Sequence, residues 1–183
     1  MIFLNLKPPI FMQLDGDVFI NPLKVWKLIE NLYLEAKSIW SAGFVWENPI
    51  WGPNRNRNGR EFIPKEIYPD SKWMNFISGP AFFLSSESVK MIFLYELCLP
   101  SMLPIHDVEL LGIVLHKLKI PMIHLNACIS PLFNKNEIIN AAKTSRNYSQ
   151  FHNLSILHTS APITEEEAFL LWNIYENNGF FIK

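Results

Sequence analysis

The stretch from Pro9 to Pro22 (PIFMQLDGDVFINP) decides the fold. Its apolar run, which lacks polar alternation, predicts a strand over 10–15 that is buried on both faces. The Asn21–Pro22 pair supplies a favoured N-cap and first helical residue, so we expect a helix to follow. Asp15 and Asp17 then fall in the turn beyond the carboxyl end of the strand, where open α/β sheets bind ligands. Two carboxylates on a glycine-containing turn can hold a divalent cation, which can in turn hold a phosphate.

Length and composition favour one folded domain over residues 1–183. Apolar residues make up 49% of the 183-residue chain, which is enough for a sizeable core. The formal net charge is −1 and the basic residues form no run, so we expect no nucleic-acid partner. No stretch reaches the ~18 uncharged apolar residues of a membrane span, and the N-terminus is a poor signal peptide.

Two features of the sequence leave alternatives open. Cys98 and Cys128 lack the spacing of a metal site; they are either buried as small apolar side chains or joined in one disulfide. Arg55, Arg57 and Arg60 form the densest basic stretch, and the surrounding Asn and Gly residues indicate a solvated loop.

Strands and helices alternate along the rest of the chain, which predicts an α/β fold with a short sheet of four or five strands. Residues 47–68 are rich in Pro, Asn, Gly and Arg, and predict a long loop of the kind that often covers a substrate. The Gly79–Pro80 pair predicts a turn, and residues 131–150 are expected to be irregular. Further strands are predicted over 38–46, 81–84, 122–126 and 154–158. Helices are predicted over 21–36, from Ser85 or Ser86 to 99, from 107 to Pro121, and from the Thr164–Glu167 capping box to 177, before Gly179.

Four segments resemble, in the same order, the inverting β-1,3-glycosyltransferases, which transfer galactose or N-acetylglucosamine. Gln13–Asn21 (QLDGDVFIN) is similar to the family's Lys-x-Asp-Asp-Asp-Val-Phe-Val-Asn segment. Tyr68–Ser85 resembles its Tyr-Pro…Gly-x-Gly-Tyr-Val-Leu-Ser stretch, and His106–Gly112 (HDVELLG) resembles Glu-Asp-Val-x-x-Gly. Ile156–Trp172 is similar to the family's Val-His-Ser…Trp ending. The resemblance implies a partial nucleotide-sugar-transferase (GT-A-like) fold, with a short mixed sheet flanked by helices.

The resemblance also implies a metal-dependent reaction with a UDP-sugar donor and a glycan or glycoprotein acceptor. It makes Asp17 a ligand of Mn²⁺, places Asp15 near the nucleotide sugar and makes His158 the second protein ligand of the metal. It assigns Asp107 as the base that takes the proton of the acceptor hydroxyl. A divalent cation would offset the charge that develops on the diphosphate leaving group, and inversion needs a base on the face opposite that group.

Several of these residues have a simpler interpretation. Asp15 and Asp17 can serve only turn and cap chemistry, Asp107 can be an N-cap, and His158 can be a satisfied histidine of a strand. Among the aromatic residues, core packing is favoured for Trp73 and Phe76, whereas for Trp46 and Trp51 core packing and sugar stacking stay equally open.

The sequence also departs from the family pattern. Gly16 replaces the middle aspartate, His106 replaces the acid before the presumed base, and Pro80–Ala81 interrupts the glycine-rich turn. Only about nine residues precede the first strand, so we expect most of the nucleotide-binding half to be absent and the chain alone to be poorly stable. Two other functions are therefore open: an inactive relative that binds only glycan, metal or a partner, and a small metal-binding α/β module. By family, the location is the lumenal side of the Golgi membrane, reached through an anchor absent from this chain.

Overall fold

A computed structural model describes residues 9–35, 39–59, 61–97, 108–125, 129, 134–144 and 155–177. The chain divides into two compact units, each built from separated segments. The first unit contains residues 1–13 and 36–124, and the second contains residues 14–35 and 125–183. Cys98, Cys128, Arg60 and Gly179 lie outside the described residues. The expectation of one domain over residues 1–183 stays a prediction.

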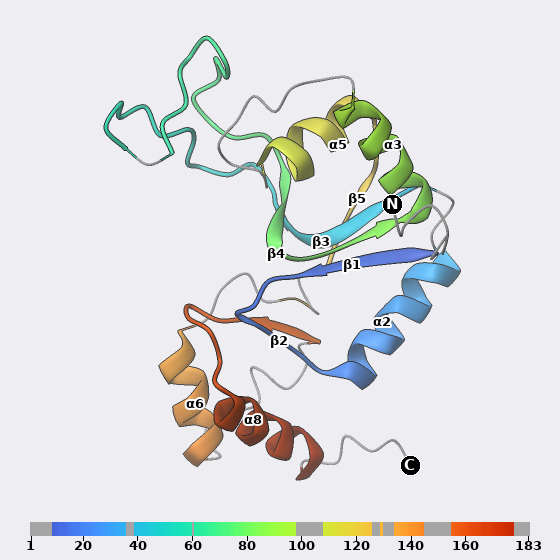
Figure 1. Cartoon of the computed structure of the whole chain (residues 1–183), viewed down its shortest axis with the longest axis vertical. Coiled ribbons are helices and arrows are strands. Elements are labelled where there is room, and N and C mark those ends of the chain that lie inside the picture. The colour runs from blue at the N-terminus through green and yellow to red at the C-terminus, as the bar shows by residue number, and fades with distance from the viewer. Residues whose placement is uncertain are drawn as a thin grey trace. The chain divides into compact units, whose positions relative to one another are not determined.

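The first unit is built on a four-stranded mixed sheet in the order β1-β4-β3-β5. Strand β3 pairs antiparallel with β4 and parallel with β5, which is what makes the sheet mixed. The predicted short mixed sheet flanked by helices is therefore confirmed (Figure 1). The bounds of its strands are β1 Ile10–Leu14, β3 Ser41–Trp46, β4 Phe76–Ser85 and β5 Met122–His124.

Strand β1 forms where the apolar run predicts it, but its predicted burial is wrong. It lies at one end of the four-stranded order, and its residues are only partly buried, with Gln13 exposed. An uninterrupted apolar run also suits a strand that is only partly buried. The pattern of apolar residues indicates which faces of a strand can be buried, but it does not show whether the strand lies at the centre or at the edge of a sheet.

The Gly79–Pro80 pair does not form a turn, contrary to the sequence prediction. Strand β4 runs through it for 10 residues. The register with β3 shifts here, since Gly43 is opposite Phe82 whereas Val45 is opposite Ile77. The pair therefore lies in a bulge, where the missing amide hydrogen of proline interrupts no ladder bond with β3.

Helices cover one face of this sheet (Figure 1). Helix α3 (Ser86–Glu96) begins at Ser85, whose hydroxyl accepts the amide hydrogen of Ser88 as expected of an N-cap. A π-helical turn η1 (Glu109–Val114) continues into α5 (Leu115–Lys117), and the helical region ends before Pro121 as predicted. The buried core between the sheet and these helices consists of Val45, Ile77, Leu84, Ile92, Leu111, Val114, Leu115 and Ile120.

The predicted long loop is confirmed, and it has its own small core. Between β3 and β4 the described residues form turns and one isolated bridge, from Asn54 to Phe62. Ile63, Tyr68, Trp73, Phe76 and Val108 form the buried cluster beneath it. Core packing of Trp73 and Phe76 is therefore confirmed. Trp46 packs against this cluster while partly buried, whereas Trp51 stays 43% exposed.

The second unit pairs β2 (Val18–Ile20) antiparallel with β6 (Ile156–His158). Helix α2 (Pro22–Glu35) follows β2, and the side chain of Asn21 accepts the amide hydrogen of Lys24, which confirms the predicted cap. Helices α6 (Lys135–Thr144) and α8 (Glu165–Asn177) lie side by side (Figure 1). Their shared core contains Ile138, Ile139, Leu157 and Leu171.

Helix α6 contradicts the expectation that residues 131–150 are irregular, and Ile138 and Ile139 mark its core-facing side. Ile138 and Ile139 are buried in the shared core, and the Asn134 carboxamide accepts the amide hydrogen of Asn136 at the helix start. The capping box of α8 is confirmed, because Thr164 and Glu167 exchange both of its bonds. Of the helices described, none is long and apolar enough to span a membrane.

The two glycines at positions 16 and 52 differ in the space around them, so we expect alanine to destabilise the chain at one position and not at the other. A Cβ at Gly52 would overlap the carbonyl oxygen of Ser71, whereas a Cβ at Gly16 would meet nothing within 4 Å. Backbone atoms cannot rotate away as a side chain can. We therefore expect Gly52→Ala to lower the free energy of unfolding by about 1–3 kcal/mol, as overpacking does.

Urea unfolding of both variants checks this prediction, with Gly16→Ala as the matched control. The control should stay within about 0.5 kcal/mol of the unsubstituted chain. An equal loss of stability in both variants would contradict the steric argument.

Candidate functional site

Asp15 and Asp17 lie in the turn between β1 and β2, as the sequence predicts. The amide of Val18 donates to the carbonyl of Asp15 (3.3 Å), which closes the turn. Strand β2 then begins at once, an element that the sequence analysis did not predict. Its pairing with β6 sets Val18 opposite His158 and brings two predicted site residues together.

The backbone of Asp17 is held by Thr159, the residue after β6. The Thr159 amide donates to the Asp17 carbonyl (3.1 Å), and the Thr159 hydroxyl lies 2.9 Å from the same oxygen. Thr159 is 1% exposed, so these contacts are shielded from water. The Asp17 backbone is therefore positioned by partly buried contacts with a residue 142 positions away in the chain, although nothing in the sequence distinguished Thr159.

The side chains of Asp17 and His158 face each other. Asp17 Oδ2 lies 3.6 Å from His158 Nε2, and the two side chains are 32% and 15% exposed. The other carboxylate oxygen, Asp17 Oδ1, is buried and has no hydrogen-bond partner among the described residues. A buried polar oxygen without a partner is costly, and such atoms often indicate a site for water or an ion.

The donors fit a cation that is only partly coordinated by protein. A carboxylate and an imidazole are both ligands of Mn²⁺-type metals. In the described part of the chain no three His, Cys, Asp or Glu side chains gather, so Asp15, which is exposed, does not complete a three-residue site. Cations of this kind are commonly bound through one or two protein groups together with substrate phosphates and water. Asp17 and His158 match that arrangement.

Asp107 lies outside the described residues, as does His106. The described chain resumes at Val108, which is 3% exposed and belongs to the cluster under the long loop. Gly112 of the same segment lies close to β4, since a Cβ there would come within 3.0 Å of Phe76 Cβ. The role of Asp107 as a base stays a prediction from the resemblance.

Comparison with known proteins identifies the family. The family model described as galactosyltransferase matches residues 4–126, which include Asp15, Asp17 and Asp107. The chain belongs to the galactosyltransferase family. This membership confirms the resemblance to β-1,3-glycosyltransferases, and the mixed α/β architecture is consistent with a partial GT-A-like fold.

Several curated relatives cover most of this family member. Human beta-1,3-galactosyltransferase 2 is 25% identical over 171 residues, which are 93% of this chain and 37% of the relative. Mouse beta-1,3-galactosyltransferase 1 is 25% identical over 88% of this chain and 44% of its own length. The lactosylceramide 1,3-N-acetyl-beta-D-glucosaminyltransferase of Xenopus tropicalis is 24% identical over 62% of this chain and 29% of its own length. The chain thus spans less than half of each of these relatives.

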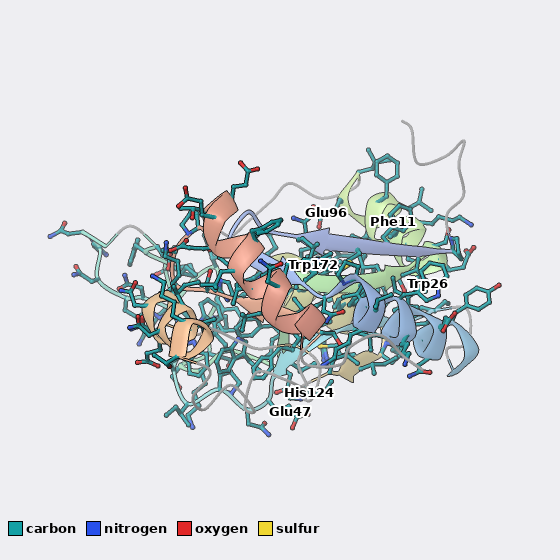
Figure 2. The ribbon with its side chains drawn as sticks, turned by 90° about the horizontal axis from the view of Figure 1, so that it is seen from below. Phe11, Trp26, Glu47, Glu96, His124 and Trp172 are labelled. Carbon is teal, nitrogen blue, oxygen red and sulfur yellow. The ribbon has the colours of Figure 1, made fainter. Side chains whose placement is uncertain are left out.

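A second polar pair in this galactosyltransferase-family chain, absent from the sequence analysis, joins β5 to the start of the long loop. His124 Nδ1 lies 3.5 Å from a carboxylate oxygen of Glu47 (Figure 2). The imidazole packs edge-on against Phe44, with ring centres 5.1 Å apart, and its Nε2 is buried with no partner among the described residues. Only the three-dimensional pairing of β3 with β5 brings these residues together, which is why no sequence spacing reveals them.

Two residues fasten the long loop. The Arg55 guanidinium donates to the carbonyls of Ile63 (2.6 Å), Tyr68 (2.6 Å) and Asp70 (2.8 Å). The prediction that Arg55 belongs to a solvated stretch is therefore wrong. The Tyr68 hydroxyl lies 3.2 Å from the Lys72 carbonyl and accepts the amide hydrogen of Met74 (3.1 Å). Burial raises the pKa of this hydroxyl above its ordinary value, and the negative charge of Asp70 adds to the rise.

The raised pKa of Tyr68 predicts a loss of stability in alkali. Above the ordinary pKa of about 10 the unfolded chain releases the tyrosine proton while the folded chain keeps it. The free energy of unfolding should therefore fall as pH rises through this region. Tyr68→Phe should flatten that fall while lowering stability at pH 7, because two hydrogen bonds are lost.

Urea unfolding between pH 8 and about 11 checks this, with Tyr33→Phe as the control because Tyr33 is 64% exposed. An alkaline slope that is the same in Tyr68→Phe and in the unsubstituted chain would contradict the prediction.

Proposed function

We propose that this chain is the part of a hexosyltransferase that holds its metal and acceptor-side groups. The reaction transfers galactose or N-acetylglucosamine from a UDP-sugar to a glycan hydroxyl, with inversion and a β-1,3 linkage. Membership of the galactosyltransferase family supports the reaction class. The observation that carries the metal site is the Asp17–His158 pair, with its 3.6 Å separation and a buried carboxylate oxygen that has no partner in the described part of the chain.

The proposed reaction is a single displacement at the anomeric carbon of the donor sugar. Asp107 accepts the proton of the acceptor hydroxyl, and the hydroxyl oxygen forms a bond to the anomeric carbon. The bond from that carbon to the phosphate oxygen breaks, and UDP leaves with the electron pair. Mn²⁺, when bound, supplies positive charge that stabilises the diphosphate leaving group.

Within that reaction the described residues bind and orient. Asp17 and the imidazole of His158 would hold the cation, and the Thr159 amide keeps the Asp17 backbone in place by donating to its carbonyl. Asp15 lies in the adjoining turn, where the resemblance places it near the nucleotide sugar. Location on the lumenal side of the Golgi membrane belongs to the same proposal, because the resemblance implies it.

A second function is favoured by one specific observation. Gly16 stands where the family has an aspartate, so the turn has one acidic oxygen donor fewer, and the described residues contain no three-ligand group. Weaker coordination would suit an inactive relative that only binds glycan, metal or a partner. Mn²⁺-dependent UDP binding supports the transferase, whereas a folded chain that shows no Mn²⁺-dependent UDP binding supports the inactive relative.

Removing the charge of Asp17 is the direct test of the metal site. We expect Asp17→Asn to weaken Mn²⁺ binding by roughly tenfold or more, because losing even the supporting partner of a metal ligand has effects of that size. Electron paramagnetic resonance of free Mn²⁺ measures binding directly, and calorimetry with UDP measures the ternary complex. Both use the whole chain.

Glu137→Gln serves as the control, since Glu137 is an exposed carboxylate of the same unit. It should leave Mn²⁺ affinity unchanged. Equal Mn²⁺ affinity in Asp17→Asn and in the unsubstituted chain would remove the assignment of Asp17.

Restoring the family's acid at position 16 should have the opposite effect. A side chain at Gly16 meets nothing within 4 Å, and its backbone does not adopt the left-handed conformation that only glycine tolerates well. Because affinity for hard cations rises with the number of charged ligands, Gly16→Asp should tighten Mn²⁺ binding by roughly threefold or more. The same resonance titration measures it, with Gly16→Ala as the uncharged control. Tighter binding in Gly16→Ala as well would show that charge is not the cause.

A further inference from the structure

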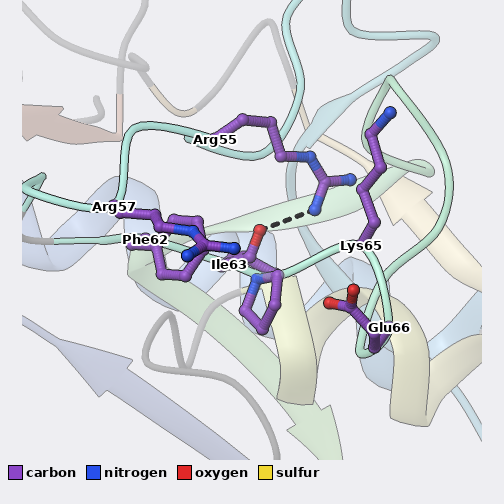
Figure 3. Close-up of a pocket in the computed structure, with 7 residues that line it drawn as sticks. Arg55, Arg57, Phe62, Ile63, Lys65 and Glu66 are labelled. Carbon is purple, nitrogen blue, oxygen red and sulfur yellow. Dashed lines mark hydrogen bonds between the residues drawn. The ribbon is translucent and has the colours of Figure 1, made fainter.

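The long loop of the first unit forms a pocket of about 550 Å³. Its lining residues are Arg55, Arg57, Phe62, Ile63, Pro64, Lys65 and Glu66 (Figure 3). This volume lies within the roughly 300–1,000 Å³ that is typical of small-molecule sites. All seven residues belong to one compact unit, so the pocket does not depend on the arrangement of the two units.

The walls of the pocket are fixed in advance of any ligand. Arg55 ties together three backbone carbonyls: that of Ile63, which lines the pocket, and those of Tyr68 and Asp70, which follow the lining segment. Ile63 is fully buried, and its amide donates to the Asn54 carbonyl (3.0 Å). The intervening turn is closed by a bond from the Gly59 amide to the Asn56 carbonyl (2.9 Å). A site that is ordered beforehand loses less entropy on binding.

The charges of the lining favour an anion. Three cationic side chains and one carboxylate line the pocket, which gives a formal balance of 3 − 1 = +2. The Arg55 guanidinium already donates hydrogen bonds to backbone carbonyls. In contrast, neither Arg57 nor Lys65 forms an ion pair or a hydrogen bond within the described part of the chain. Figure 3 shows these two side chains on different sides of the bond from Arg55 to Ile63. Both are exposed, so they can close on a ligand.

The remaining lining suits a sugar ring. Phe62 and Pro64 are half-buried and present apolar faces, on which the C–H groups of a pyranose can pack. The carboxylate of Glu66 can accept hydrogen bonds from ring hydroxyls. An inorganic anion alone would use the cations but not the aromatic face or the carboxylate.

We propose that this pocket binds an anionic sugar, one that bears a sulfate or a carboxylate, with Arg57 and Lys65 on the anion and Phe62 against the ring. The sugar would be a residue of the acceptor glycan; in that respect alone the inference rests on the proposed function. The pocket would then select charged acceptors over neutral ones.

The test is a nuclear magnetic resonance titration of the whole chain with galactose 6-sulfate, glucuronic acid, galactose and inorganic sulfate. We expect either anionic sugar to bind at least threefold more tightly than galactose and than inorganic sulfate. Arg57→Gln and Lys65→Gln should each weaken that binding by roughly two- to fivefold, the size expected of exposed charge pairs. Lys117→Gln, an exposed cation of the same unit that does not line the pocket, should change nothing.

Three results would overturn the inference. One is that galactose, galactose 6-sulfate and glucuronic acid all bind with equal affinity. Another is that Lys117→Gln weakens binding of the anionic sugars as much as Arg57→Gln and Lys65→Gln do. The third is UDP binding that depends on Arg57 and Lys65, because the pocket would then serve the nucleotide. UDP is titrated separately; the sugar titrations contain no metal and no UDP, so they are independent of Asp17. If the chain binds Mn²⁺ through Asp17 but binds no anionic sugar, the proposed function stands and this inference fails. If it binds anionic sugars through Arg57 and Lys65 but binds no Mn²⁺, the inference about the pocket stands and the proposed metal site fails.

Discussion

The pairing of β2 with β6 is the interaction on which the candidate metal site depends. It joins the turn after β1 to the segment after β6, and its antiparallel register sets Val18 opposite His158. Thr159 extends the pairing with two contacts to the Asp17 carbonyl. Without this short ribbon Asp17 would sit on an ordinary surface turn. With it, one oxygen of the carboxylate is buried with no hydrogen-bond partner among the residues that the structure describes, and the other faces an imidazole.

The long loop shows a different way of building a site. It has almost no regular secondary structure. It is anchored by the buried side chains of Ile63 and Tyr68 and by the hydrogen bonds of the Arg55 guanidinium. Since a charged donor satisfies several carbonyls at once, such a loop can be ordered without strands or helices. The cations that it leaves at its rim, Arg57 and Lys65, are therefore held on a defined surface.

Much of the fold could be predicted because its signals are local. The caps at Asn21 and Ser85 and the capping box of Thr164 and Glu167 each depend on residues within four positions of one another. The pairing of β2 with β6 could not be predicted, since strands of three residues carry no periodicity and their partners are remote. The Gly79–Pro80 pair misled for a related reason: the same dipeptide suits a turn or a bulge, and the partner strand decides. At the site, the family resemblance pointed to Asp17 and His158, but residue spacing alone gave no sign of Thr159 or of the three bonds made by Arg55.

The separation of 142 positions between Thr159 and Asp17 also bears on the order of folding. Closing so long a loop has an entropic cost that only the contacts formed afterwards offset. Pairings between such distant residues therefore form late in folding. During synthesis Asp15 and Asp17 emerge from the ribosome well before β6 does, because more than 130 residues separate them. The two halves of the candidate metal site therefore exist together only after β6 has been synthesised, and a nascent chain stopped before Ile156 contains Asp17 but no His158.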